Sequence, residues 1–144
     1  MGLKARKIKT MIEEYADQCL NDLNSKLGTT FQLNIDWNCL PENIDGWNWQ
    51  DDELKTCFYN SYFYPVETAF QEMFKDKMYK EAISEQVKTL KIQGGEYSIG
   101  CDVIDGAFVY KHIMSVNQRE LRLNEHFNRT AINKVTSAID TKLN

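Results

Sequence analysis

Six carboxylates and three tryptophans share one stretch of the sequence, residues 36 to 53, that contains no lysine or arginine. Carboxylates attract and orient a basic partner, whereas tryptophan side chains supply a large contact area. This combination indicates binding to a basic protein rather than a reaction. The expected partner-binding residues are Asp45, Trp47, Trp49, Asp51, Asp52 and Glu53.

Part of this stretch also has a structural explanation. Trp37 follows the alternation of a predicted strand and is expected to face the core. Residues 51 to 53 precede Leu54, a position typical of an N-cap followed by the acidic first turn of a helix. Neither explanation covers Trp47 and Trp49, which the sequence leaves open between the edge of the core and the surface.

No residue pattern in the chain indicates catalysis or metal binding. The sequence contains two histidines, His112 and His126, which excludes a histidine-rich metal site. Residues 51 to 53 lack the spacing of a calcium loop, and Gly94-Gly95 lacks the glycine fingerprint of a phosphate loop. We therefore expect no catalytic residue, no metal ion and no cofactor.

A second charged surface is predicted on the last helix, where His126 shares a face with Arg122 and Arg129. These three side chains together can hold an anion. The same spacing is more typical of a solvated helix face, because residues three and four apart are neighbours on any helix. This face is the alternative interface if residues 45 to 53 bind nothing.

The composition is that of an ordinary globular protein of 144 residues with a net charge of −4. An acidic balance argues against nucleic-acid binding, and no apolar stretch approaches the roughly 20 residues that span a bilayer. The lack of a linker rich in proline or glycine predicts a single domain over residues 1–144. We expect a soluble, cytoplasmic protein.

The four cysteines are widely spaced and contain no CxxC pair. Three of them lie among apolar residues on predicted helices or strands. Buried free thiols are therefore expected, as in a reducing cytosol. The cysteines are Cys19, Cys39, Cys57 and Cys101.

The first half of the chain predicts a helix, a strand and a second helical region. An apolar stripe with helical spacing runs through the first 27 residues and ends at Gly28, which suits a helix C-terminus. Residues 31 to 37 alternate between apolar and polar, as in a strand with one buried face. Helical spacing returns from Leu54 to Phe74, and Pro65 within it either starts a new helix or kinks a long one.

The second half predicts three strands and a final helix. A short helix leads into a strand near Leu90 and Ile92. Asp105-Gly106 is a strong signal for a type I′ hairpin turn, pairing Val103 with Phe108 and Cys101 with Tyr110. A capping box at Asn117 and Glu120 is expected to begin the last helix.

Together these elements predict an α+β fold in the order α-β-α-(α)-β-β-β-α. We expect one two-layer domain in which about four mostly antiparallel strands pack against helices. The buried face of the sheet is expected to carry Phe31, Leu33, Ile35, Val103, Phe108 and Tyr110.

A small acidic α+β domain that carries Asp45-Gly46-Trp47-Asn48-Trp49-Gln50-Asp51-Asp52-Glu53 resembles the immunity proteins of interbacterial toxin systems, including contact-dependent inhibition. The resemblance is one of general type. It implies an inhibitor that occupies the active-site groove of a basic toxin domain, often a nuclease, with carboxylates in place of phosphates. The high use of lysine and asparagine over arginine also suits an AT-rich bacterial gene.

Two other classes of function remain open from the sequence. One is a small-ligand-binding or enzymatic domain with an aromatic-lined pocket between the sheet and the helices, since the chain is rich in phenylalanine and tyrosine. The other is an adaptor or structural subunit that uses the same acidic surface for a different partner.

Overall fold

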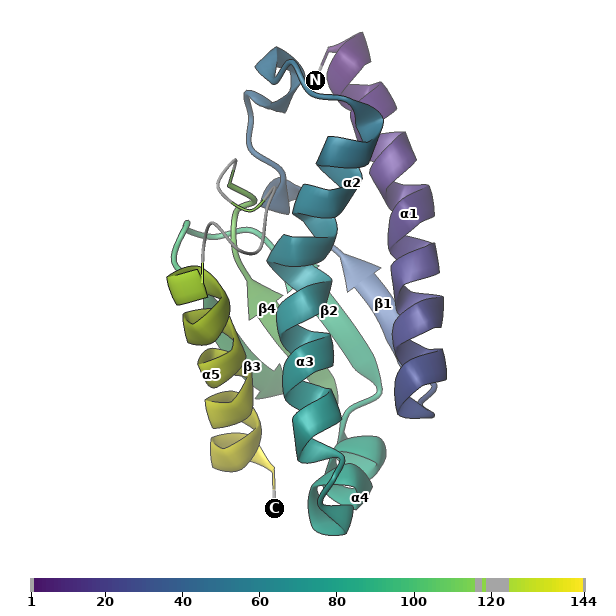
Figure 1. Ribbon diagram of the computed structural model, residues 1–144, viewed down its shortest axis with the longest axis vertical. Coiled ribbons are helices and arrows are strands. Elements are labelled where there is room, and N and C mark those ends of the chain that lie inside the picture. The colour runs from purple at the N-terminus through teal and green to yellow at the C-terminus, as the bar shows by residue number, and fades with distance from the viewer. Residues whose placement is uncertain (1, 116–117, 119–124, 144) are drawn as a thin grey trace.

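The computed structural model describes residues 2–115, 118 and 125–143. Within these residues the elements follow the predicted order, with α2, η3 and α3 forming one helical column (Figure 1). The helices and strands are α1 (Leu3–Leu27), β1 (Gln32–Ile35), η1 (Trp37–Cys39), η2 (Ile44–Gly46), α2 (Asp51–Phe58), η3 (Tyr59–Phe63), α3 (Tyr64–Met73), α4 (Lys77–Gln86), β2 (Thr89–Gln93), β3 (Gly100–Ile104), β4 (Ala107–Lys111) and α5 (Glu125–Lys142).

The four strands form one sheet in the order β1-β2-β4-β3. β1 is parallel to β2, β2 is parallel to β4, and β3 alone is antiparallel to its neighbour. The prediction of a mostly antiparallel sheet was therefore wrong, because the described sheet is mixed and mostly parallel. The helices between β1 and β2 return the chain to the end of the sheet where β1 began, so β2 runs in the same direction as β1.

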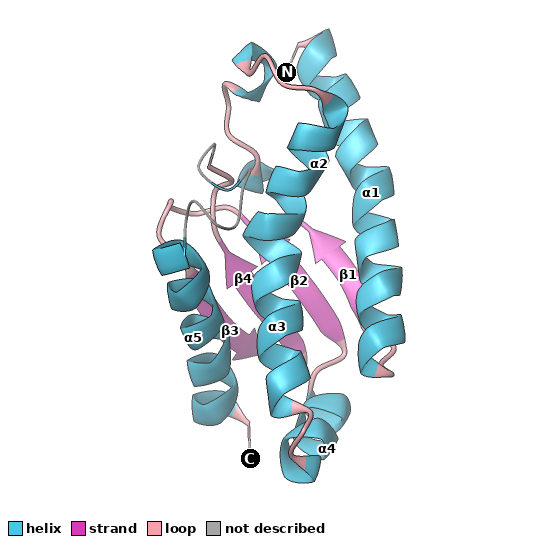
Figure 2. Cartoon of the chain, in the orientation of Figure 1, coloured by secondary structure: helices cyan, strands magenta, loops and turns pink. Residues whose placement is uncertain are grey.

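The long helices lie over one face of the sheet. Figures 1 and 2 show α1, the α2–α3 column and α5 in front of the strands, with α4 at the lower end. Side chains alternate accordingly in β2, where Leu90 and Ile92 are buried while Lys91 between them is only partly covered. The helices therefore supply one side of the core and the sheet supplies the other.

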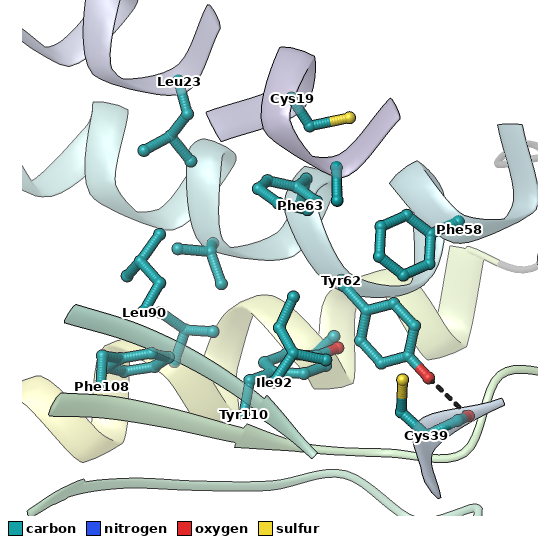
Figure 3. Close-up of a cluster of buried hydrophobic side chains, with 14 of the residues drawn as sticks. Cys19, Leu23, Cys39, Phe58, Tyr62, Phe63, Leu90, Ile92, Phe108 and Tyr110 are labelled. Atoms are coloured by element: carbon teal, nitrogen blue, oxygen red, sulfur yellow. Dashed lines mark hydrogen bonds between the residues drawn. The ribbon is translucent and has the colours of Figure 1, made fainter. Parts of the chain in front are cut away.

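The predicted buried face of the sheet is the face that meets the helices. Phe31, Phe108 and Tyr110 are buried, whereas Leu33, Ile35 and Val103 are partly buried and pack against the same core. Figure 3 shows the sheet side chains of this core opposite Cys19 and Leu23 from α1. Large rings fill the space between the sheet and the helices. Phe108 packs edge to face against Phe70, with ring centroids 5.6 Å apart.

The hairpin predicted at Asp105-Gly106 is confirmed. Both turn residues have positive φ, 48° at Asp105 and 80° at Gly106, as a type I′ turn requires. The pairing is also as predicted, with Val103 opposite Phe108 and Cys101 opposite Tyr110.

Pro65 lies in the first turn of α3. The turn before it is a π-helix, in which the Tyr64 amide bonds to the Tyr59 carbonyl five residues back. Proline lacks the amide that would bond to residue 61, and a widened turn accommodates this loss without ending the helical column. Pro65 therefore lies in the first turn of α3, within a helical column that continues from α2 through η3.

The C-terminus of α1 is also as predicted, since Gly28 has φ 68° and its amide bonds to the Asn24 carbonyl. The capping box expected at Asn117 and Glu120 lies outside the described residues. In the described part of the chain, no helix combines the length and the apolar character needed to cross a membrane.

Candidate functional site

The acidic stretch forms a loop between β1 and α2, which we call the acidic loop (residues 36 to 53). It starts with the short helix η1, where the Asp36 carboxylate accepts a hydrogen bond from the Asn38 amide at 3.2 Å. It ends at α2, where the Glu53 carboxylate accepts from the Gln50 amide at 3.0 Å. Gln50 is therefore the N-cap, and Asp51, which the sequence suggested as a cap, belongs to the first turn.

Apolar side chains fasten the acidic loop to the rest of the protein. Leu40, Pro41 and Ile44 are buried. Trp47 and Trp49 are partly buried, pack against the core and contact each other with ring centroids 4.7 Å apart. The sequence left open whether Trp47 and Trp49 lie against the core or on the surface. Each does both, because it is anchored on the core and keeps part of its surface in solvent.

Trp37 lies on the core side of the loop, as predicted. Its ring stacks on Phe58 with centroids 6.4 Å apart, and the Lys9 ammonium lies 5.8 Å from the centre of the Trp37 ring. Trp37 therefore joins the start of the acidic loop to both α1 and α2.

All the carboxylates of the acidic loop are exposed. Within the described residues, no basic group lies within 4 Å of any of them to form an ion pair. Asp51, Asp52 and Glu53 also occupy the first turn of α2, where the positive end of the helix dipole favours negative charge. These three carboxylates stabilise the N-terminus of α2 and remain exposed to solvent.

The fold brings the acidic loop next to the start of α1, whose first turns are rich in lysine and arginine. A Cβ placed on Gly2 would lie 3.7 Å from Oδ2 of Asp45. The first turn of α1 contains no acidic residue, and its N-cap Gly2 makes no side-chain capping bond. Asp45 thus supplies negative charge to the N-terminus of α1, and Lys4, Arg6, Lys7 and Lys9 follow within the first turns of that helix.

The alternative surface on α5 is described only in part. His126 and Arg129 are exposed, and Arg122 lies outside the described residues. In Figure 1 the α2–α3 column separates α5 from α1, so this surface is distinct from the acidic loop.

A buried carboxylate that the sequence analysis missed lies between α1 and α3. Glu67 has a side-chain exposure of 7 %, and its Oε1 lies 2.9 Å from the Lys26 ammonium. The Tyr59 hydroxyl donates to Oε2. The pKa of Lys26 is raised by its hydrogen bond to Glu67 and by the charge of that carboxylate, while burial is the largest cause of the raised pKa of Tyr59.

Both oxygens of Glu67 have partners, so this group clamps α1 against α3. The only sequence signal for it is a carboxylate next to the apolar positions Val66, Ala69 and Phe70. Its partner Lys26 is too far away in the sequence for any periodicity to connect the two.

The cysteines are free thiols, and Cys19, Cys39 and Cys57 are buried. Burial raises the pKa of Cys19 to about 11 and that of Cys39 to about 12. Protonated buried thiols are poor nucleophiles and poor metal ligands. The described residues contain no group of three or more His, Cys, Asp or Glu side chains arranged to hold a metal ion.

Comparison with protein-family models, with curated proteins and with solved structures found no significant match.

Proposed function

We propose that this chain is a non-enzymatic protein-binding module that neutralises a basic toxin domain, in the manner of an immunity protein. The acidic loop is the proposed interface, with Asp45, Trp47, Trp49, Asp51, Asp52 and Glu53 as its contact residues. The observation that carries the proposal is the position of exposed carboxylates, unpaired with basic groups among the described residues, around the half-buried Trp47–Trp49 pair.

The two kinds of side chain serve different steps of binding. Exposed carboxylates steer a basic partner from a distance and raise the association rate. Tryptophans near the centre of an interface contribute most of the affinity when the partner excludes water from them. Because Trp47 and Trp49 are already held against the core, little side-chain freedom is lost when a partner covers them.

The first turns of α1 supply an element of specificity in this proposal. Gly2 at the start of this helix lies beside Asp45, and the basic residues follow in the next turns, so a partner meets a negative surface with a positive border. A partner that matches both signs is preferred over a uniformly basic surface, because like charges brought together at the border are repelled.

The experiment is to co-express the chain with the product of the neighbouring gene in its genome and to titrate the two purified proteins by calorimetry. We expect a stoichiometric complex with a basic domain whose toxicity or enzymatic activity is suppressed. The proposal fails if the neighbouring genes encode a metabolic pathway and no basic protein binds. It also fails if a complex forms but hydrogen exchange leaves residues 36 to 53 unprotected.

A further inference from the structure

A cavity of about 620 Å³ lies on the far side of the fold from α1, between α5, the end of β4 and the segment before β3. Its walls include Ile99 and Phe127, which are apolar, and the polar side chains of Tyr97, His112, His126 and Lys134. A volume of this size falls within the roughly 300–1,000 Å³ typical of small-molecule sites. The acidic loop contributes nothing to its walls, so the cavity is independent of the proposed toxin interface.

His112 lines this cavity, and backbone hydrogen bonds hold it on both sides. It follows β4 directly, and its amide donates to the Gln93 carbonyl at 3.0 Å. Its carbonyl accepts a hydrogen bond from the Tyr62 hydroxyl at 2.8 Å. The imidazole lies between two rings, with its centroid 5.9 Å from that of Tyr62 and 5.0 Å from that of Phe127.

The imidazole of His112 is buried, with an exposure of 1 %, and among the described residues neither ring nitrogen makes a hydrogen bond of good geometry, although the Tyr97 backbone lies close enough to the ring to influence it. Leaving a buried polar atom unpaired is costly, and buried polar groups in native proteins nearly always have a partner. With the Tyr97 backbone near one side of the ring, at least one nitrogen of this cavity-lining imidazole lacks a partner, which points to a ligand that supplies it.

Burial lowers the pKa of His112 to about 4, against the smaller opposing effect of the Tyr97 carbonyl. The ring is consequently neutral at pH 7 and presents one donor and one acceptor. The neutral ring is suited to a hydrogen bond with a polar substituent of a ligand, not to an ion pair with a charged group.

The positive charge in the cavity wall comes from Lys134. Lys134 lies on α5, and the described residues that line the cavity include no carboxylate. On the rim, Ser98 donates to Glu96, which is not part of the lining. Lys134 is exposed, and its ammonium, with no lining carboxylate among the described residues, favours an anionic group on the ligand.

We propose that this cavity binds a small aromatic carboxylic acid, with its ring against Phe127 and His112 and its carboxylate at Lys134. The neighbouring rings provide a flat apolar contact, and aromatic groups favour offset or edge-to-face packing against them. A polar substituent on the ring of the ligand pairs with the free nitrogen of His112. The carboxylate accepts a charge-assisted hydrogen bond from Lys134.

The test is a titration of the purified full-length chain with 4-hydroxybenzoate, followed by ¹H–¹⁵N NMR that includes the histidine side chains, and by calorimetry. We expect saturable shifts at the His112 ring and at the Phe127 and Lys134 amides. The neutral analogue 4-hydroxybenzamide and the non-aromatic acetate ion should each bind about tenfold more weakly or less, the ratio expected when one charge-assisted contact or the ring packing is lost.

Variants separate this site from general attraction to a positive surface. Lys134→Met should weaken binding of 4-hydroxybenzoate about tenfold. Lys142→Met removes the same charge from the same helix outside the cavity lining and should leave binding unchanged. His112→Gln should lower affinity, and circular dichroism must show that each variant is folded.

Three results would overturn the proposal. The first is the absence of shifts at His112 and Phe127 with millimolar 4-hydroxybenzoate, and the second is equal binding of acid and amide. The third is an equal effect of Lys134→Met and Lys142→Met, which would identify surface charge as the cause. Since the wild-type titration decides the first two, the proposal stays testable even if a variant fails to fold, and none of these results bears on toxin binding by the acidic loop.

Discussion

Asn38 and Gly94 approach each other so closely that no side chain fits on residue 94. The Gly94 amide donates to Oδ1 of Asn38 at 2.6 Å, and a Cβ on Gly94 would lie 2.3 Å from the Asn38 carbonyl oxygen. Asn38 belongs to η1, directly after β1, and Gly94 directly follows β2. This contact therefore holds the start of the acidic loop against the ends of the two parallel strands.

We expect Gly94→Ala to destabilise the protein by about 2 kcal/mol, because the added methyl group overlaps backbone atoms that cannot move without shifting η1. Urea unfolding measures the change. Gly95→Ala is the matched control, since a Cβ there would have its nearest neighbour at 4.0 Å, on Lys111. Equal stability of the two variants would contradict the close approach.

Gly106→Val should cost about 1–2 kcal/mol, because a β-branched residue is strained at the φ of 80° that the hairpin turn requires. Thermal melting detects this loss. Gly100→Val is the control within the same hairpin, since position 100 has no positive φ and a Cβ would make only an ordinary contact at 3.8 Å. An unchanged melting temperature for Gly106→Val would argue against the type I′ turn.

The buried tyrosines Tyr62 and Tyr110 are expected to respond in opposite directions to the loss of their hydroxyl groups. The Tyr62 hydroxyl lies 3.0 Å from the Cys39 carbonyl and 2.8 Å from the His112 carbonyl, and Figure 3 shows it directed at Cys39. The Tyr110 hydroxyl is buried and has no hydrogen-bond partner among the described residues.

Tyr62→Phe should therefore lower the free energy of unfolding by about 1 kcal/mol, whereas Tyr110→Phe should leave it unchanged or raise it by up to about 1 kcal/mol. Each variant serves as the control for the other, because both remove one buried oxygen. Chemical denaturation of the two proteins side by side gives the comparison. Finding Tyr110→Phe to be the less stable of the two would show that the roles are reversed.

His112 should make the protein sensitive to acid between pH 6.5 and 4. The unfolded chain takes up a proton on this residue near pH 6.5, whereas burial in the fold lowers the pKa of His112 to about 4. The unfolded state binds more protons throughout this interval. The free energy of unfolding therefore carries the full contribution of His112 above pH 6.5 and loses it as the pH decreases to 4. The contribution is about 3 kcal/mol over the whole interval.

Unfolding free energies of the wild type and His112→Gln across this range check the prediction, since the variant should lose less stability on acidification. His126→Gln removes the exposed histidine and should follow the wild type. Parallel curves for the wild type and His112→Gln would show that other groups cause the acid sensitivity.

For the proposed complex, charge reversal at Asp45, Asp51 and Asp52 should slow association and weaken its dependence on salt. Long-range steering is screened beyond a Debye length of about 8 Å at physiological ionic strength. Trp47→Ala or Trp49→Ala should instead speed dissociation. If the ring is a buried anchor, the binding free energy should fall by about 2 kcal/mol.

Stopped-flow and surface-binding kinetics separate the two effects. Charge reversal at Glu72, Glu81 and Glu85 changes the net charge equally on exposed acids of α3 and α4 and should have a smaller effect. All variants must melt as folded proteins, since Asp45 also lies beside the N-terminus of α1. If the charge-reversed and tryptophan variants bind as well as the parent, the exposed face of α5 around His126 and Arg129 becomes the candidate interface.

The sequence was sufficient wherever the deciding interactions are local. The Asp105-Gly106 turn depends on two consecutive residues that tolerate positive φ, and it sets the register of β3 against β4 without help from the rest of the fold. The end of α1 at Gly28 is local for the same reason. The exposure of the acidic loop carboxylates also follows from their chemistry, because a charge is costly to bury without a partner.

Only the tertiary structure decided how the strands are ordered and which distant groups meet. Alternating residues in β1 and β2 are compatible with either strand direction, and the path through α2, α3 and α4 makes the pair parallel. The same holds for the contact of Asn38 with Gly94, the pairing of Lys26 with Glu67 and the burial of His112 against Phe127. Each joins segments separated by many residues, so no periodic pattern encodes it, and it arises only when packing the helices onto the sheet brings those segments together.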